Sequence, residues 1–147
     1  MYLHLYLRNG KVFIPTTGAV HEGLYRDIEP VAAMDVSDSH SIREALRARI
    51  ARGNPSTPYY PRGAYPQPVV LKHAGVKSWW AFARGASPWL IKEDDRGHQI
   101  IGHRMHPDGW VEDPQQRFEF SRGTSIDSVI DRMIAILQEA AKKPKDT

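Results

Sequence analysis

Residues 2–14 read YLHLYLRNGKVFI and carry the clearest structural signal in the chain. Every second residue from Leu3 to Leu7 is leucine, and this period of two places the leucines on one face of a strand. Asn9-Gly10 supplies the two positive-φ positions of a type I′ turn. This turn pairs Leu7 with Val12, so that apolar side chains meet across the two strands. The segment therefore predicts a β-hairpin.

The rest of the chain yields a series of shorter elements. We expect a loop over 15–23, one or two strands over 24–36 interrupted at Pro30, a short strand at 69–71, a helical turn at 76–83, a hairpin over 89–105 that turns at 94–97, and a short strand at 118–120. A first helix is expected to begin at Ser41 with a capping box to Glu44 and to end at Gly53. The apolar positions between Ile126 and Leu137 follow helical spacing and predict the strongest helix.

Together these elements predict a single α+β domain over residues 1–147. We expect a mostly antiparallel, twisted sheet covered on one face by the C-terminal helix and the first helix. Residues 54–68 hold five prolines and three tyrosines, which indicates an extended, polyproline-like strap that crosses the domain. Residues 142–147 are expected to form a flexible tail.

The composition excludes several classes of protein. The chain has no cysteine, so it has neither a disulfide framework nor a thiolate nucleophile. No apolar run reaches the ~18 residues that cross a bilayer, and the first residues do not follow the layout of a secretory signal. We therefore expect a cytoplasmic protein that does not bind a membrane. No cofactor is expected either, because no phosphate-binding glycine motif occurs.

Charge is distributed unevenly along the chain. Residues 39–92 hold nine basic residues and one acidic residue, a net charge of +8, whereas residues 93–139 carry −5. Segments of opposite sign can form two charged faces, and such faces steer a protein toward a charged macromolecule. The alternative is that the segments intermix in space and produce no net field.

Three histidines, His98, His103 and His106, resemble a metal cluster by their spacing. On a strand, however, His98 and His106 share one face while His103 points to the other. Convergence on one ion would require a bulge, and no paired cysteine or zinc-protease motif is present. The sequence therefore predicts no metal site.

Two functions other than protein binding remain open. Acid–base catalysis, as in a small metal-independent ribonuclease, could use five residues that occur in the sequence without any diagnostic spacing: His4, His21, Glu22, His40 and His73. The basic 39–92 region could instead bind nucleic acid through the arginines of the first helix and of the strap: Arg43, Arg47, Arg49, Arg52 and Arg62. No nucleophile elbow is present, and a chain without catalytic residues is the favoured prediction.

Exposed aromatic residues beside carboxylates favour a protein-binding surface. One of the adjacent Trp79 and Trp80 should point outward, and tryptophan is enriched at binding hot spots. Trp110 is a second such aromatic residue, since it is expected on a loop between Asp108 and the pair Glu112-Asp113. The expected interface with a basic partner consists of Glu93, Asp94, Asp95, Asp108, Trp110, Glu112 and Asp113.

Three segments resemble the immunity proteins of bacterial contact-dependent growth inhibition systems. They are YLHLYLRNGKVFI (2–14), VKSWWAFARGA (76–86) and GTSIDSVIDRMI (123–134). The resemblance implies a small cytoplasmic α+β protein without catalytic residues. It also implies a partner, the C-terminal domain of a cognate toxin, often a nuclease, whose active site or an adjacent surface the immunity protein occludes. No functional residue of the family maps onto this chain.

Overall fold

The computed structural model describes residues 1–143 except 22, 62 and 108. In chain order its elements are β1 (Tyr2–Arg8), β2 (Lys11–His21), β3 (Leu24–Asp35), α1 (Ser39–Arg52), α2 (Val70–Ala74), α3 (Trp79–Ala83), β4 (Ala86–Asp94), β5 (Gly97–His106), β6 (Gly109–Glu119) and α4 (Ile126–Ala141). The strands form one sheet in the order β3-β2-β1-β4-β5-β6, and each neighbouring pair is antiparallel.

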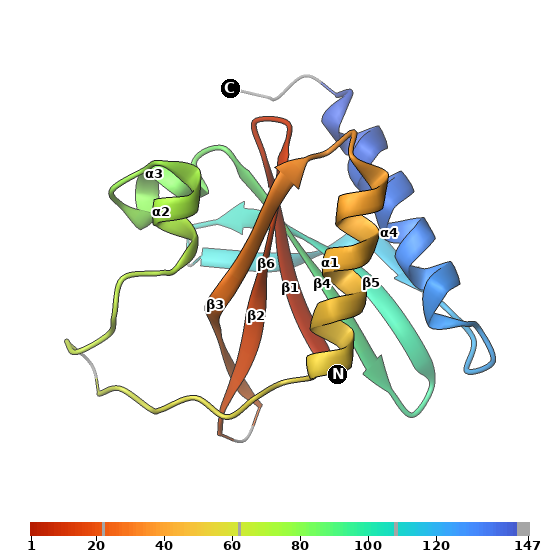
Figure 1. Cartoon of the computed structure of the whole chain (residues 1–147), viewed down its shortest axis with the longest axis horizontal. Helices are drawn as coiled ribbons and strands as arrows, with labels where there is room; N and C mark the ends of the chain where they lie inside the picture. The colour runs from red at the N-terminus through yellow and green to blue at the C-terminus, as the bar shows by residue number, and fades with distance from the viewer. Residues whose placement is uncertain (22, 62, 108, 144–147) are drawn as a thin grey trace.

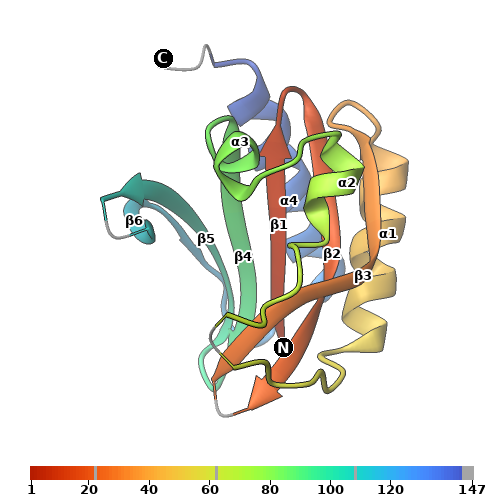
Figure 2. The same ribbon diagram turned by 90° about the vertical axis from the view of Figure 1, so that its left-hand side faces the viewer.

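The two long helices lie on one face of this sheet and the two short helices on the other. Figure 1 shows α1 and α4 side by side in front of the sheet, and Figure 2 shows α2 and α3 against the opposite face. The structure thus confirms the predicted α+β domain with a twisted antiparallel sheet covered by the first and last helices.

The N-terminal hairpin forms as its sequence predicts. Leu7 is paired with Val12 across the two strands. Asn9 and Gly10 adopt φ values of 51° and 75°, the left-handed conformations of a type I′ turn. Because β1 lies between β2 and β4, its alternating side chains face two different layers of the molecule.

The larger core lies between the sheet and the two long helices. The leucines of β1 contact an apolar stripe on α4 and a shorter one on α1. Buried helix residues that contribute to this core are Ile42, Leu46, Val129, Ile130, Met133, Ile134 and Leu137. Ser125 caps α4 by accepting a hydrogen bond from the backbone N–H of Ser128. Helical spacing of apolar residues therefore identified α4 correctly.

Residues 15–21, which we expected in a loop, continue β2. Proline and small polar residues suggested a loop, but Thr16 and Thr17 are each only 1% exposed. The strand persists because it is paired with β3 on one side. The ladder is irregular between Ile14 and Thr16, opposite the part of β3 that contains Pro30. Pro30 was predicted to mark an edge or a bulge, and β3 is indeed an edge strand with an irregularity there.

Three further predictions of secondary structure were wrong. Helix α1 begins at Ser39 and not at Ser41, because the Asp38 carboxylate accepts the Ser41 backbone N–H at 3.0 Å and acts as the N-cap. Residues 70–74 form a helix where we expected a strand. The last strand covers 109–119 and not only 118–120, and it lies at an exposed edge where hydrophobic periodicity is weak.

The strap at 54–68 is attached to the sheet at its start. The backbone N–H of Ala19 donates to the Pro55 carbonyl at 2.8 Å, and the N–H of Thr57 donates to the Ala19 carbonyl at 3.0 Å. The Asn54 amide donates to the carbonyls of Tyr2 and Thr17 at 2.6 and 2.8 Å and accepts the Tyr2 N–H at 3.1 Å. Asn54 thus joins β1 and β2 beyond the last residues that the two strands pair directly.

Some predictions fall partly outside the described residues. Of the tail predicted at 142–147, only Lys142 and Lys143 are described, and the backbone N–H of Lys142 donates to Glu139 at the end of α4. No helix within the described part of the chain is long and apolar enough to span a membrane.

We predict that Asn54→Ala lowers the free energy of unfolding by about 2–3 kcal/mol, because it removes three hydrogen bonds and leaves two strand carbonyls without their donors. Urea unfolding at pH 7 measures the change. Gln67→Ala, which alters an exposed amide in the same strap, is the control and should change stability by less than about 0.5 kcal/mol. An equal loss in both variants would contradict a specific role for Asn54.

Candidate functional site: an aromatic groove under the strap

The face of the sheet opposite α1 and α4 carries the polar and aromatic half of β1. Tyr6 belongs to a second, smaller core, where it contacts Phe13 and Phe82, and its ring meets Phe82 edge to face. Tyr2 stacks on Tyr25 of β3, with ring centroids 4.2 Å apart. This face is therefore organised by aromatic contacts that begin on the central strand.

A groove of about 690 Å³ lies on this face between the sheet and the strap. It is lined by His4, Tyr6, Val20, Leu24, Tyr25, Arg26, Asp27, Ile28, Thr57, Tyr59, Tyr60, Tyr65, Pro66, Gln67, Pro68, Val69 and Trp79. In Figure 2 the strap crosses the same face as α2 and α3. The strap therefore supplies one wall of the groove, and β1 and β3 supply its floor.

The polar residues of the floor form one hydrogen-bonded cluster. The Asp27 carboxylate accepts from the Tyr6 hydroxyl through one oxygen and lies 2.8 Å from His4 Nδ1 through the other. Asp27 orients the imidazole through Nδ1, which leaves Nε2 for other partners. Burial first, and then the charge and hydrogen bond of Asp27, raise the pKa of Tyr6 well above its usual range.

Arg26 fixes the strap over the groove. Its guanidinium lies 4.5 Å from the centroid of the Tyr60 ring and donates a hydrogen bond to Thr57 Oγ1. A guanidinium over an aromatic face is an attractive arrangement that also shields the ring from water. The strap's position thus depends on a side chain from β3, the strand that also supplies Asp27.

Several large apolar side chains in the groove or next to its lining residues remain exposed. Tyr65 is 64% exposed, Tyr59 59% and Leu24 46%, and on α3 the exposed fractions are 37% for Trp79 and 69% for Trp80. All of them except Trp80 line the groove, and Trp80 is next to Trp79 on α3. We call these five residues, four of which are aromatic, the aromatic rim. As predicted, one of the two adjacent tryptophans points outward. Exposed tryptophan and tyrosine at one place favour a binding surface over a purely structural role.

The acidic residues predicted to form one interface are divided between two places. Glu93, Asp94 and Asp95 lie at the turn between β4 and β5, whereas Trp110, Glu112 and Asp113 lie on β6 near the other end of β5. Asp108 is outside the described residues. The strands therefore do not gather the six described residues into one patch.

Part of this acidic charge is also engaged locally. Glu93 lies 3.1 Å from His98 Nε2, Asp94 accepts hydrogen bonds from Gln99 and from the Arg96 backbone, and Glu112 lies 3.4 Å from Arg117. Asp113 accepts from the backbone of Gln115. These contacts order the β4–β5 turn and the first half of β6, and they reduce the negative charge that is available to a partner.

Glu112 lies on the face of the groove. It is opposite His103 on β5. The pairing of Trp89 with Gly102 places Pro88 beside His103, and Pro88 is paired with Tyr6. The pKa of Tyr2 is raised by burial and then by the negative charge of Glu112, which places that charge near the N-terminal end of β1. Glu112 therefore flanks the aromatic surface, at a distance from the turn acids.

Of the arginines expected to contact nucleic acid, two on α1 pair with carboxylates of α4. Arg43 lies 3.0 Å from Asp131, and Arg47 lies 3.1 Å from Asp127. Arg49 donates to the Ile14 carbonyl, and Arg62 lies outside the described residues. The basic and acidic segments of the chain thus intermix on the helical face, which was the alternative to two opposite charged surfaces.

The histidines do not form a metal site in the described part of the chain. No group of three or more metal-binding side chains occurs there. His98 lies on β5 against Glu93, and burial lowers the pKa of His103 on the opposite face of the strand. Of the catalytic candidates, His73 pairs with Glu29 on the surface and Glu22 is not described. Among the candidates that the structure describes, only His4 joins a polar cluster in a groove, and nothing in the sequence pattern indicated its partner Asp27.

Comparisons with known proteins support the fold and give no function. No family model and no curated protein matches the chain. A protein of unknown function from Neisseria meningitidis, NMB0488, matches it in structure with a TM-score of 0.64 and 11% sequence identity, over 95% of this chain and 93% of that one. At this identity the similarity extends to the fold alone.

We predict that Tyr6→Phe lowers stability at pH 7 by about 1.5–3 kcal/mol, because a buried hydrogen bond to a carboxylate is lost. The raised pKa of Tyr6 adds a pH dependence. Its contribution is complete below the unfolded-state pKa near 10 and is lost as pH rises toward the higher folded pKa. The variant should therefore lose less stability than the wild type above pH 10.

Urea unfolding between pH 7 and 11 checks both effects. Tyr65→Phe alters an exposed phenol and is the control, which should follow the wild-type curve. If Tyr6→Phe and the wild type lose stability in parallel above pH 10, the shift in the pKa of Tyr6 is refuted.

Proposed function

We propose that this chain is a cytoplasmic immunity protein that binds the C-terminal domain of a cognate bacterial toxin and blocks its active site or an adjacent surface. The observation that carries the proposal is the aromatic rim, where four exposed apolar side chains line one groove and a fifth, Trp80, is next to Trp79 on α3. The proposed class of partner comes from the resemblance of three segments to immunity proteins of contact-dependent growth inhibition systems.

The rim has the composition expected of a binding hot spot. Tyrosine and tryptophan bury a large apolar area on binding, and both fix few rotatable bonds in doing so. The rim is built on ordered elements, because Trp79 and Trp80 belong to α3 and Leu24 to β3, and the strap is attached through Asn54 and Arg26. A surface ordered before binding loses less conformational entropy when the partner arrives.

The acidic residues have a secondary role in this proposal. Glu112 lies on the same face as the groove and would approach a basic toxin at the edge of the contact. Glu93, Asp94 and Asp95 lie at the far turn and would act mainly by long-range attraction. Attraction of this kind changes the association rate and its salt dependence more than the dissociation rate.

We predict that the double variant Trp80→Ala/Tyr65→Ala weakens toxin binding by about 100-fold or more and abolishes protection of cells that produce the toxin. The partner is the toxin domain encoded beside the gene of this protein, and calorimetry measures the dissociation constant. Because both side chains are exposed, the unfolding midpoint should not change. Met105→Ala, at an exposed apolar residue of β5 outside the rim, is the control and should bind as the wild type does.

The charge-reversed variant Asp94→Lys/Asp95→Lys/Glu112→Lys tests the acidic interface expected from the sequence. We expect a slower association rate and a change in dissociation rate of less than about three-fold. If the charge-reversed variant dissociates much faster than the wild type and the Trp80→Ala/Tyr65→Ala variant binds normally, the interface lies at the acidic residues and not at the aromatic rim. Failure of the wild-type protein to bind or neutralise the toxin would reject the immunity function itself.

A second candidate function is supported by one observation, the His4–Asp27 pair at the floor of the groove. A carboxylate that orients an imidazole through Nδ1 leaves Nε2 as a general base, and such a base is part of a metal-independent ribonuclease. Incubation with a mixed-sequence RNA tests this candidate. Cleavage by the wild type that His4→Gln removes would support an enzyme, whereas the immunity proposal expects intact RNA in both samples.

A further inference from the structure

A second groove, of about 1000 Å³, opens on the helical side of the sheet between α4 and the last two strands. It lies beside β5 and β6, which in Figure 2 bend away from α4 and toward the opposite face. The pairing of β5 with β6 shifts between Ile101 and His103, and the extra residues on β6 include Gln115 and Gln116, which line the groove. This groove lies on the face of the sheet opposite the aromatic rim and is independent of the proposed function.

The floor of the groove is the indole of Trp89. This side chain is 6% exposed, and its Nε1–H is buried without a hydrogen-bond partner among the described residues. Gly102 allows the ring to lie against β5, since a Cβ there would be 3.0 Å from the ring and 2.7 Å from Gln116 Cβ. A buried N–H without an acceptor is costly, so a ligand that supplies an acceptor would stabilise this arrangement.

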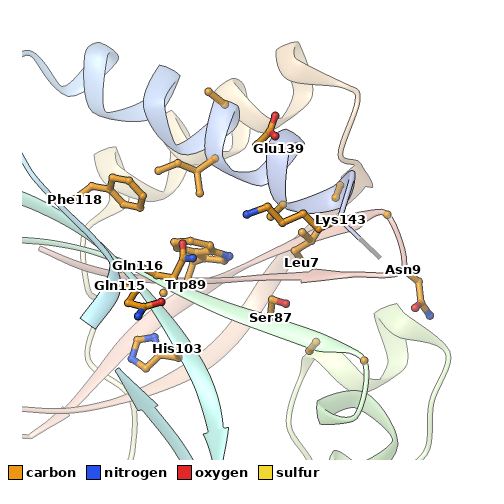
Figure 3. A pocket seen from close by; sticks show the side chains of 18 of the residues that line it. Leu7, Asn9, Ser87, Trp89, His103, Gln115, Gln116, Phe118, Glu139 and Lys143 are labelled. Carbon is orange, nitrogen blue, oxygen red and sulfur yellow. The ribbon is translucent and has the colours of Figure 1, made fainter. Parts of the chain in front are cut away.

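The charged side chains that line the groove favour an anion. Figure 3 shows Lys143 extending from the end of α4 toward Trp89, whereas Glu139 points away from it. Arg132 also lines the groove, with its guanidinium 5.3 Å from the centroid of the Phe118 ring. Near Trp89, Figure 3 labels one cationic group, Lys143, together with the neutral side chains of Ser87, Gln115 and Gln116. One ammonium group with an indole N–H and neutral donors suits a single carboxylate better than a more highly charged phosphate.

The rest of the lining is mixed: polar side chains from β4, β6 and the β1–β2 turn lie on one side, and an apolar wall from α4 and Phe118 lies on the other. Phe118 faces the apolar residues of the last turns of α4, including Ile136 and Ala140. The volume corresponds to that of a small-molecule site and not of a bound protein domain. We propose that this groove binds an amphipathic monocarboxylate, whose carboxylate accepts from Trp89 Nε1 beside Lys143 and whose hydrocarbon chain contacts Phe118 and Ile136.

Calorimetric titration of the full chain with sodium octanoate tests this proposal. We expect saturable binding with one site per chain, and octan-1-ol, which lacks the carboxylate, should bind at least ten-fold more weakly. Trp89→Phe keeps a ring in the core but removes the N–H, and it should weaken octanoate binding about ten-fold, as expected for one hydrogen bond to a charged group.

Two lysines provide a matched pair of variants that should not affect folding. Lys143→Gln should weaken octanoate binding several-fold and remove most of its salt dependence. Lys142→Gln should leave binding unchanged, because Lys142 does not line the groove and lies 3.8 Å from Glu139. If Trp89→Phe lowers stability, the comparison of Lys143→Gln with Lys142→Gln still tests the site.

The result that would overturn the proposal is equal affinity for octanoate and octan-1-ol, or equal effects of the two lysine variants. Tighter binding of a short glutamate-containing peptide than of octanoate would also overturn it, because the groove would then serve a protein segment. None of these outcomes depends on the toxin, so the proposed immunity function can fail while the carboxylate site stands, and the reverse also holds.

Discussion

The alternation of side chains along β1 is the constraint on which the rest of the structure depends. Because β1 is central in the sheet, its odd residues must be buried against α1 and α4, and its even residues must face the strap and the short helices. A shift of one residue would place His4 and Tyr6 in the apolar core and three leucines in the groove. The Asn9-Gly10 turn fixes the register and therefore fixes both faces together.

Both grooves arise where the regular sheet is interrupted. β1 and β2 are joined by the Asn54 side chain at one end, and the same segment leads the strap across the aromatic face. On the other face, the irregular pairing of β5 and β6 coincides with the bend that separates β6 from α4, next to Trp89. Bulges and irregular edges are common beside functional sites because they redirect side chains without disturbing the core.

Hydrophobic periodicity predicted the parts of the fold in which one face is buried. The β1–β2 hairpin and α4 follow that rule, and β1, its turn and α4 were identified with nearly correct bounds. The same reasoning failed for residues 15–21 and for β6, where pairing with neighbouring strands maintains a strand that local sequence does not favour. It also failed at the start of α1, since serine and aspartate are both good N-caps and spacing alone does not choose between them.

The candidate site was harder to predict, because its members come from distant parts of the chain. His4 was one of several possible catalytic residues, but nothing in the sequence connects it to Asp27, which it meets only because β2 brings β3 alongside. The acidic interface was inferred from proximity in sequence, and a strand of ten residues separates its two halves. Side chains close in sequence share a surface only when no extended strand lies between them. Trp79 and Trp80, which belong to one short helix, satisfy that condition, and the acids on either side of β5 do not.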